Sequence, residues 1–290
     1  MTRTLHHFDT LERSLTEAGD RHALWSSQAF ADRLTAHLDA VLSSQDVLSL
    51  DVFDTLVLRD NSAEISRFVA IGAEMQALAE DRLKRGLGAQ EGFLARWLGT
   101  RASYRATEAV QGCREGSLTE IQRTASRLLI GSDALTEPFI EVELAHEATR
   151  ISPNPVLVAY MHRHRARGGR VLLLTDMYMH APQVADLLTR VGISGDSYDH
   201  LISSADTKVS KASGGIFALA EDAMQAGPDR FLHLGDSFRG DVQRPKQHGW
   251  RAQHLPLSLA DIAERQADHD KSVAMLTETL GYAPDIARPR

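Results

Sequence analysis

Cysteine is nearly absent from this chain of 290 residues, and Cys113 is its only representative. One cysteine cannot form an internal disulfide, and it excludes a cysteine-rich zinc site and a CxxC redox pair. Long apolar runs are missing too, since none approaches the roughly 18 residues that a membrane-spanning helix needs. The N-terminus also lacks the apolar core of a secretion signal. These absences predict a cytoplasmic protein without a membrane partner.

Positive charge is also scarce. The chain carries 32 Lys and Arg against 39 Asp and Glu, a formal net charge of −7, and its isoelectric point is near 6.0. Nucleic-acid binding draws on counterion release, which requires a concentrated field of Lys and Arg. A nucleic-acid partner is therefore not expected. One short basic cluster is assigned to a solvated helix face and consists of His162, Arg163, His164, Arg165, Arg167 and Arg170.

The start of the chain divides into a helical stretch and a strand. Residues such as Leu34 and Leu38 recur at helical spacing, which predicts helices over 1–45 that pack on the remainder of the chain. The apolar segment that begins at Val47 runs straight into Asp51. This segment predicts a buried strand that ends at a loop.

Residues 61–150 contain only helical patterns. Apolar residues recur there at three- and four-residue spacing, and no convincing strand interrupts them. Ser117 and Glu120 form the S-x-x-E pattern of a capping box at the head of one helix. We interpret the apolar stripes as the core of a helix bundle, formed by Phe68, Ile71, Met75, Leu78, Phe93, Leu94, Trp97 and Leu98.

Helices and strands alternate after Pro155, a proline typical of a first helical turn. Repeated strand–helix units imply a parallel, doubly wound, Rossmann-like sheet of the α/β class. The predicted helices include 181–191 and 214–226, and the predicted strands are Val171–Thr175, Tyr198–Ser203, Phe231–Gly235 and Arg251–Leu255. This order predicts four parts: an N-terminal helical appendage (1–45), a core (46–60 with 151–260), a helical insertion (61–150) and a C-terminal helix or tail (261–290).

Polar residues stand at the ends of three predicted strands. Asp51, Thr175 and Asp236 occupy these positions, and ligands of parallel sheets bind at the carboxyl ends of the strands. Carboxylates can hold Mg²⁺, and a hydroxyl can bind a phosphate oxygen. A lysine such as Lys208 or Lys211 in the intervening loop can neutralise charge on a transferring group. The set predicts metal-assisted phosphoryl chemistry.

Four segments resemble, in the same order, the four motifs of the haloacid dehalogenase superfamily: LSLDVFDTLV, RVLLLTDMY, KASGGIF and LHLGDSFRGDV. The resemblance covers about 46–255, and the helical insertion lies where that family carries its first cap domain. It implies a phosphatase-like hydrolase with a Rossmann-like core, a helical cap, Mg²⁺ as cofactor and a covalent aspartyl intermediate.

By this resemblance Asp51 is the nucleophile, Thr175 holds the phosphoryl group, and Lys211 neutralises charge. Lys211 is preferred to Lys208 because K-x-S-G-x-[IL]-F resembles the start of the helix after motif three. The arrangement makes physical sense, since a carboxylate repels an approaching phosphate dianion and nearby positive charge offsets that repulsion.

The resemblance also implies a metal site. Asp51 and Asp236 are the implied carboxylate ligands, and Asp241, at the spacing GDSxxxD, supports either the metal or Lys211. In this superfamily the backbone carbonyl two residues after the nucleophile binds the metal as well. That residue is Phe53 in this chain.

Phe53 marks a departure from the phosphatase pattern. Phosphatases of this superfamily generally carry D-x-D, in which the second aspartate acts as acid and base, whereas this chain has D-V-F-D. Dehalogenases of the family carry an aromatic residue there and need neither acid nor metal. They lack the GDSxxxD site, however, and converging Asp51, Asp236 and Asp241 would be costly without a cation. Phosphoryl chemistry is therefore favoured, with Asp54 either replacing the missing acid or holding the turn.

The remaining assignments concern the substrate. Arg59 either meets an anionic substrate or forms a surface ion pair, and Asp176 is either a substrate-side residue or structural. The variant D-x-F-D-T-L with T-D-M-Y resembles superfamily members found near or fused to polysaccharide-synthesis enzymes. It implies a sugar phosphate or a nucleotide-linked sugar as the small-molecule substrate. The alternatives are a metal-independent dehalogenase-type hydrolase that uses Asp51 and a catalytically silent binding module.

Overall fold

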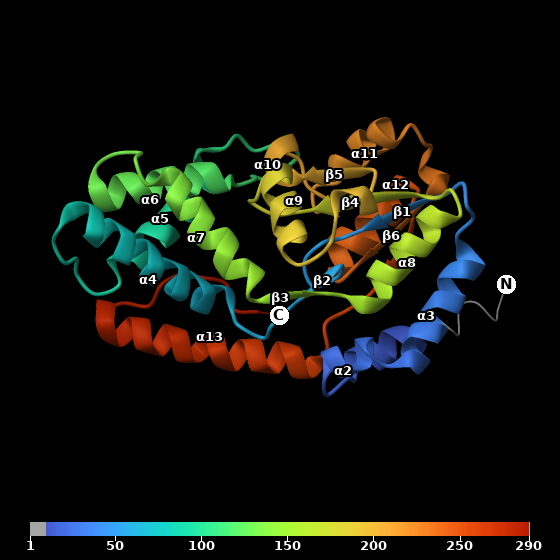
Figure 1. The fold of residues 1–290 in the computed structure, drawn as a ribbon, viewed down its shortest axis with the longest axis horizontal. Helices are drawn as coiled ribbons and strands as arrows, with labels where there is room; N and C mark the ends of the chain where they lie inside the picture. The colour runs from blue at the N-terminus through green and yellow to red at the C-terminus, as the bar shows by residue number, and fades with distance from the viewer. Residues whose placement is uncertain (1–9, 290) are drawn as a thin grey trace. The chain divides into compact units, whose positions relative to one another are not determined.

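The computed structural model describes residues 10–289 (Figure 1). The part of the predicted N-terminal appendage at 1–9 lies outside the described residues. None of the described helices combines the length and the apolar character of a membrane span. The described residues form two units. The first runs to Arg59 and includes Ala109–Cys113 and Ile151–Asp261, and the second is Asp60–Glu108, Arg114–Arg150 and the described residues from Ile262 onward.

A five-stranded sheet forms the centre of the first unit. Its strands follow the order β5-β4-β1-β6-β7, and every neighbouring pair is parallel. The central strand β1 is buried along its whole length, which agrees with its sequence, apolar except for Ser49. The predicted doubly wound α/β fold is therefore confirmed. The strands are β1 (Val47–Leu50), β4 (Arg170–Thr175), β5 (His200–Ser203), β6 (Phe231–Gly235) and β7 (Arg251–His254).

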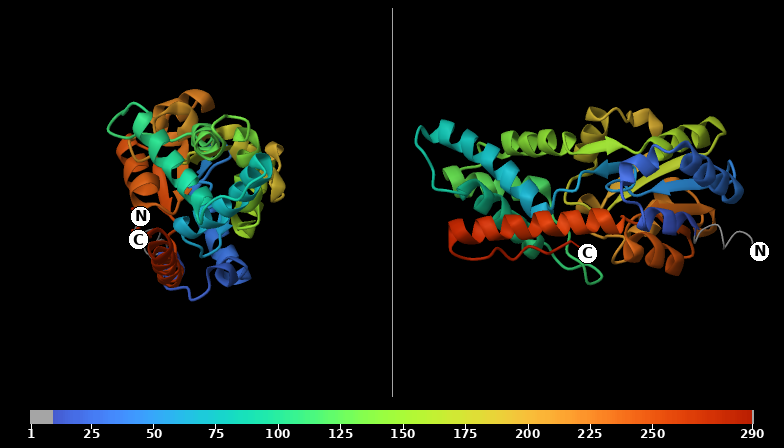
Figure 2. Two further views of the ribbon diagram at one scale, coloured as in Figure 1. Left: turned by 90° about the vertical axis from the view of Figure 1, so that its left-hand side faces the viewer. Right: turned by 90° about the horizontal axis from the view of Figure 1, so that it is seen from below.

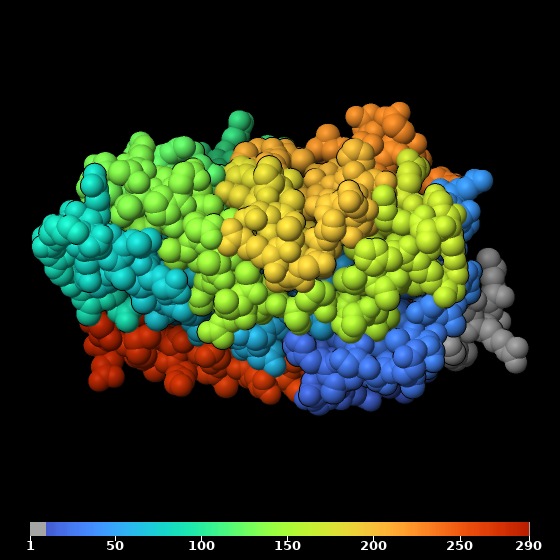
Figure 3. All heavy atoms as spheres, in the orientation of Figure 1, coloured from blue at the N-terminus to red at the C-terminus, as the bar shows by residue number. Residues whose placement is uncertain are grey.

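Helices cover both faces of this sheet. One apolar cluster joins Val47 and Leu172 of the strands to Phe217 of α11 and to Trp250, which stacks on Phe231 at 4.0 Å between ring centroids. Figure 2 shows helices on both sides of the strands, and α8 and α9 cover the face seen in Figure 3. These helices are α8 (Pro155–Ala166), α9 (Ala181–Arg190), α10 (Ser204–Thr207), α11 (Ile216–Met224) and α12 (Arg244–His248). Between them lie 3₁₀ turns at η1 (Gly195–Ser197) and η2 (Pro228–Arg230) and a π-helical turn at η3 (Phe238–Gln243).

Local signals account for the helix starts. Pro155 occupies the first turn of α8, as predicted, and the Asn154 side chain accepts hydrogen bonds from two amides of that turn. In the N-terminal segment, α2 (Arg21–Trp25) and α3 (Gln28–Val41) follow a helical stretch at 10–16. The predicted apolar face of α3 is buried, which confirms the helical interpretation for the described part of this segment.

A short antiparallel ribbon was not predicted. It pairs β2 (Val57–Arg59) with β3 (Ile151–Pro153). Each strand has only three residues, and so neither shows a periodic pattern, and the two partners lie more than 90 positions apart in the chain. The strand predicted at Tyr198–Ser203 is shorter in the structure, where it begins at His200.

The second unit is helical in the part that the structure describes, and the predicted helices at 61–150 are confirmed. Ser117 caps its helix by accepting a hydrogen bond from the Glu120 amide at 3.4 Å. Leu78 and Leu98, which we expected in the core, are 39% and 43% exposed, because the helices touch along a narrower stripe than the sequence indicated. The helices are α4 (Glu64–Leu83), α5 (Glu91–Ala106), α6 (Leu118–Ile130), α7 (Thr136–Ala148) and α13 (Leu259–Leu280), the last of which begins in the first unit.

Two polar contacts hold the helices of this unit together. Arg96 and Glu143 form a fully buried ion pair, and the Gln122 side chain donates to the same carboxylate at 2.5 Å. The amide of Ala63, at the head of α4, donates to Asp268 of α13 at 2.8 Å. The C-terminal helix thus supplies the cap that Ala63 has no side-chain oxygen to provide.

Candidate active site

The sheet brings the predicted site residues to one edge. Because β1 lies between β4 and β6, the residues at the carboxyl ends of these three strands become neighbours. Strand order reverses at β1, and such a switch point is the usual ligand site of an open α/β sheet. A cavity of about 320 Å³ opens there. All the predicted site residues line it, namely Asp51, Phe53, Asp54, Arg59, Thr175, Asp176, Lys211, Asp236 and Asp241.

Lys211 is the lysine at the centre of the site. Its Nζ lies 2.6 Å from Asp51 Oδ1 and 2.6 Å from Asp241 Oδ1, and the side chain is 3% exposed. Burial alone would lower the pKa of Lys211, but the charges of the surrounding carboxylates, Asp241 first, raise it above its usual value. Lys208 does not line the cavity, and its Nζ donates to the Ala205 carbonyl at 2.6 Å. The geometry thus favours Lys211 over Lys208.

Asp241 is held by a hydrogen-bonded network in the core. It lies in η3, a π-helical turn, and accepts from the Ser237 amide at 2.8 Å. His233 Nε2 lies 3.0 Å from Asp241 Oδ1, and His233 Nδ1 lies 2.7 Å from the Ser49 hydroxyl. Burial would raise the pKa of Asp241, but Lys211 and His233 more than offset it and hold that pKa below its usual range.

Ser49 and His233 support Asp241 of the site, and the sequence motifs did not indicate them. They face each other in the register of β1 and β6, and burial lowers the pKa of His233. A neutral imidazole donates from Nε2 to Asp241 and accepts the Ser49 hydroxyl at Nδ1. The sequence signal that could have indicated them is a polar residue inside each of two otherwise apolar strands. Gly235 belongs to the same arrangement, because a Cβ there would approach the Asp241 carboxyl carbon to 2.3 Å.

Three carboxylates converge on one side of the cavity. One oxygen each of Asp51, Asp236 and Asp241 lies within 4.8 Å of the others. Burial, together with the charge of Asp241 and against the pull of Lys211, raises the pKa of Asp51 to about 7. Burial and the charge of Asp51 likewise raise the pKa of Asp236 well above its usual value. Lys211 therefore does not offset all the negative charge, and the oxygen ligands suit a divalent cation such as Mg²⁺.

Asp176 connects the second motif to the lysine loop. One of its oxygens accepts from the Lys211 amide at 2.8 Å and the other from the Ala212 amide at 3.1 Å. The carboxylate thereby fixes the backbone that carries Lys211, which favours the structural alternative for Asp176. Thr175, immediately before it, is buried at the end of β4 and lines the cavity.

The loop after Asp51 contains the residues that depart from the phosphatase pattern. The Arg59 guanidinium lies 4.2 Å from the centre of the Phe53 ring, so the two form a cation–π contact at the cavity wall. Asp54 has a left-handed backbone with φ of 61°. Its carboxylate lies 3.0 Å from Nη2 of Arg21, a residue outside the motifs that the sequence did not single out.

Carboxylates and a lysine thus meet at the carboxyl edge of a parallel, doubly wound sheet. The sequence model of the haloacid dehalogenase-like hydrolases matches residues 45–249, more than half of the chain. The chain belongs to this family. In a comparison with curated proteins, no sequence matched.

We compared the chain with solved structures. A 2-haloacid dehalogenase from Pseudomonas syringae pv. tomato DC3000 is 15% identical with a TM-score of 0.52, and the likeness covers 80% of this chain and 99% of that one. A HAD phosphatase from Thermococcus onnurineus is 17% identical with a TM-score of 0.47, covering 72% of this chain and 85% of that one. At these identities the likeness to the dehalogenase concerns the fold alone.

Proposed function

We propose that this protein is a Mg²⁺-dependent hydrolase that acts on a phosphorylated small molecule through an aspartyl-phosphate on Asp51. The observation that carries the proposal is the convergence of three carboxylates, two of which form ion pairs with a buried lysine. A site with this much uncompensated negative charge is suited to bind a cation and, through it, a phosphoryl group.

The chain's own residues provide the covalent chemistry. An oxygen of Asp51 attacks the phosphorus, the bond from phosphorus to the leaving oxygen breaks, and the leaving group departs with the electron pair. Water then attacks the same phosphorus, releases phosphate and restores the carboxylate. Lys211 neutralises charge beside Asp51 in both steps, and the Thr175 hydroxyl binds a phosphoryl oxygen.

The residues present fit a magnesium ion. Asp51, Asp236, Asp241 and the Phe53 carbonyl would hold it, and all four residues line the cavity. When bound, Mg²⁺ supplies positive charge that polarises the phosphoryl group and offsets its repulsion by Asp51. Asp241 also forms an ion pair with Lys211 and a hydrogen bond with His233. It would therefore hold Lys211 in place in addition to binding the ion.

Phe53 limits the kinds of substrate that the site can hydrolyse. Without an aspartate at this position, the leaving oxygen receives no proton from the usual acid, and a good leaving group is favoured. Arg59 and Arg239 bring positive charge to the cavity wall, which suits a substrate with more than one anionic group. A nucleotide-linked sugar meets these requirements through its diphosphate, whereas a sugar phosphate, the other candidate substrate, has a poorer, alkoxide leaving group.

A second candidate function is metal-independent dehalogenation by Asp51. The aromatic ring of Phe53 beside the nucleophile favours it, because an aromatic residue occupies this position in the D-x-Y-G-T motif of dehalogenases. In that reaction the carboxylate displaces halide from carbon, and water hydrolyses the resulting ester.

Two assays distinguish these functions, and a variant tests the nucleophile that they share. We expect hydrolysis of an aryl phosphate that EDTA abolishes and added Mg²⁺ restores, whereas metal-independent release of halide from a 2-haloacid would support the second candidate. In either case we expect Asp51→Asn to lose more than about 10³-fold in rate while circular dichroism stays unchanged. An inactive wild type in both assays, or an active Asp51→Asn variant that remains folded, would contradict the covalent mechanism.

A further inference from the structure

The N-terminal helix α2 contributes a buried arginine to the loop that follows the nucleophile. Arg21 is 2% exposed, and its Nη2 lies 3.0 Å from Asp54 Oδ1. The same nitrogen donates to the Arg59 carbonyl at 2.8 Å. Arg21 therefore contacts both ends of the stretch 54–59, which begins three residues after Asp51 and ends in β2.

The other side of the guanidinium is held by a second segment. Arg21 Nε lies 3.3 Å from Asp261 Oδ2. The Asp261 amide donates to the Ser258 hydroxyl at 3.0 Å, and the Ser258 amide donates to the Asp261 carboxylate at 3.3 Å, so the two form a capping box at the head of α13. Arg21 and Asp261 both lie outside the matched family region 45–249, whereas Asp54 lies inside it.

The contacted loop has a physical need for such support. Asp54 is not a glycine, yet its φ of 61° lies in the left-handed region, which is unfavourable for most side chains. A buried guanidinium beside Asp54 offsets the charge of its carboxylate and holds that carboxylate in one orientation. The loop's own support includes the backbone hydrogen bond from Val57 to Val52 at 2.8 Å.

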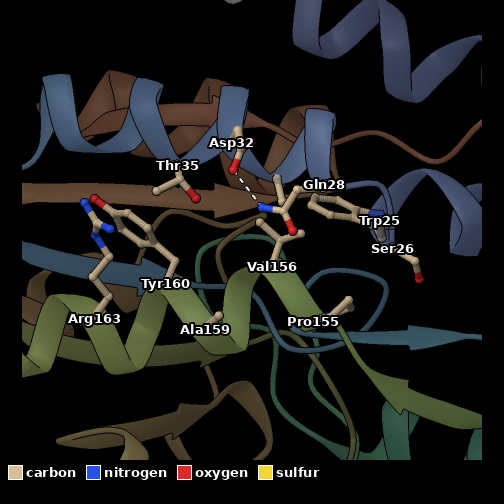
Figure 4. A pocket seen from close by; sticks show the side chains of 11 residues that line it. Trp25, Ser26, Gln28, Asp32, Thr35, Pro155, Val156, Ala159, Tyr160 and Arg163 are labelled. Carbon is tan, nitrogen blue, oxygen red and sulfur yellow. Dashed lines mark hydrogen bonds between the residues drawn. The ribbon is translucent and has the colours of Figure 1, made fainter.

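The segment that carries Arg21 is packed against the core. Trp25, at the end of α2, is 2% exposed and meets Phe30 edge-on at 5.1 Å between ring centroids. Further along, Asp39 of α3 accepts from Tyr160 of α8 at 3.2 Å. Figure 4 shows α3 and α8 facing each other across a groove of about 500 Å³, with Trp25 near one end and Tyr160 near the other.

We propose that Arg21 is a positioning residue of the active site. Through Asp54 and the Arg59 carbonyl it holds the loop that follows Asp51, residues 52–59, in the conformation that hydrolysis requires. The segment before the family core is then an integral part of the site. This inference rests on the proposed function, because the loop it organises carries the nucleophile Asp51 and the metal-binding carbonyl of Phe53.

A double-mutant cycle tests the proposal. We expect Arg21→Gln to lower kcat on an aryl phosphate by roughly 10- to 100-fold, because small displacements of reacting groups cost this much, with KM changed less than about twofold. In an Asp54→Asn background, Arg21→Gln should lower kcat only a few-fold, since the ion pair between residues 21 and 54 is already lost. Arg21→Lys should recover part of the rate, because an ammonium can still reach one of the two acceptors.

The matched control is Asp39→Asn, which also removes a charged contact between the N-terminal segment and the core but lies outside the cavity. It should leave kcat within about twofold of the wild type, as a surface ion pair contributes little. Equal losses from Arg21→Gln in the wild-type and Asp54→Asn backgrounds, or the same loss in Asp39→Asn, would overturn the proposal in favour of general destabilisation.

Hydrogen–deuterium exchange provides a readout that does not depend on activity. In Arg21→Gln, amides of residues 51–57 should exchange at least about tenfold faster, while those of α3 stay protected, because the loss of support is local. Unchanged exchange in 51–57 overturns the inference even if Asp51→Asn abolishes turnover. Conversely, faster exchange in 51–57 supports the inference even if no phosphatase activity is found.

Discussion

Lys208 and Lys211 are three positions apart, yet only Lys211 enters the cavity. We predict that Lys211→Met lowers kcat/KM on an aryl phosphate by at least about 10²–10³-fold, because it removes the positive charge beside Asp51 and Asp241. Lys208→Met is the matched control and should stay within about twofold. Steady-state kinetics, with folding checked by circular dichroism, measures both. A greater loss in Lys208→Met would assign the motif-three role to Lys208.

Asp54 is the residue whose role the motif left open. Because Arg21 holds its carboxylate, we predict that Asp54→Asn slows the hydrolysis of alkyl and aryl phosphates by similar factors and lowers the melting temperature. A general acid would behave differently, since its loss costs about 10²–10⁴ on a poor leaving group and much less on a phenolate. Rates for a series of phosphate esters distinguish the two roles, and a loss confined to alkyl esters would make Asp54 the acid.

At the level of elements, the pairing of α13 with α4 gives a clear test. Asp268 accepts from the Ala63 amide and also from the Ser66 hydroxyl. We predict that Asp268→Ala lowers the free energy of unfolding of the second unit by about 1–2 kcal/mol, as expected for the loss of a helix cap. Urea denaturation followed by circular dichroism measures the change.

Asp270 supplies the control in the same helix. It forms an ion pair with Arg288 that is more than half exposed on both sides, and Asp270→Ala should therefore change the free energy of unfolding by less than about 0.5 kcal/mol. Similar losses in the two variants would mean that the cap at Ala63 contributes nothing specific.

Most of these elements were predictable from their own residues. The strand β6 has the bounds predicted for it, Phe231–Gly235, and α8 begins at its proline. The ribbon of β2 and β3 was not predictable, because it is stabilised by pairing between distant segments and not by any pattern within either strand.

Across the first unit, Asp46 joins three parts of the chain. It accepts from the Ser43 amide at 2.8 Å and pairs with Arg230 at 3.2 Å and Arg251 at 3.1 Å. Burial alone would raise the pKa of Asp46, but the Ser43 amide and Arg251 outweigh it and hold the pKa below its ordinary value of 3.8. A carboxylate with a depressed folded-state pKa stabilises the fold above its unfolded pKa, and this stabilisation is lost as pH falls through the folded pKa.

We therefore predict that Asp46→Asn lowers the free energy of unfolding by about 1–3 kcal/mol at pH 7. The difference from the wild type should remain constant down to about pH 5 and shrink as the pH falls below about 4, where the wild-type carboxyl becomes protonated. Urea denaturation at a series of pH values follows this difference. A difference that grows towards acid pH would contradict the assigned sign.

The sequence by itself determined the class of the whole molecule. An apolar strand that ends in Asp51, polar residues after two later strands, and the alternation of strands with helices together predict a parallel sheet with its site at one edge. These signals are local, because each depends on a few neighbouring residues and on the geometry that every parallel sheet shares. The nine predicted site residues accordingly line one cavity.

Only the tertiary structure decided how those residues are supported. Ser49 and His233 meet through strand register, and Arg21 reaches Asp54 from 33 positions earlier in the chain. Each contact joins side chains that have no fixed spacing in sequence, so no local pattern encodes it. For the lysines, the motif resemblance already favoured Lys211 over Lys208, and the tertiary structure adds the physical reason. Lys208 has a left-handed backbone, and the amides of Lys211 and Ala212 donate to Asp176, which orients the loop.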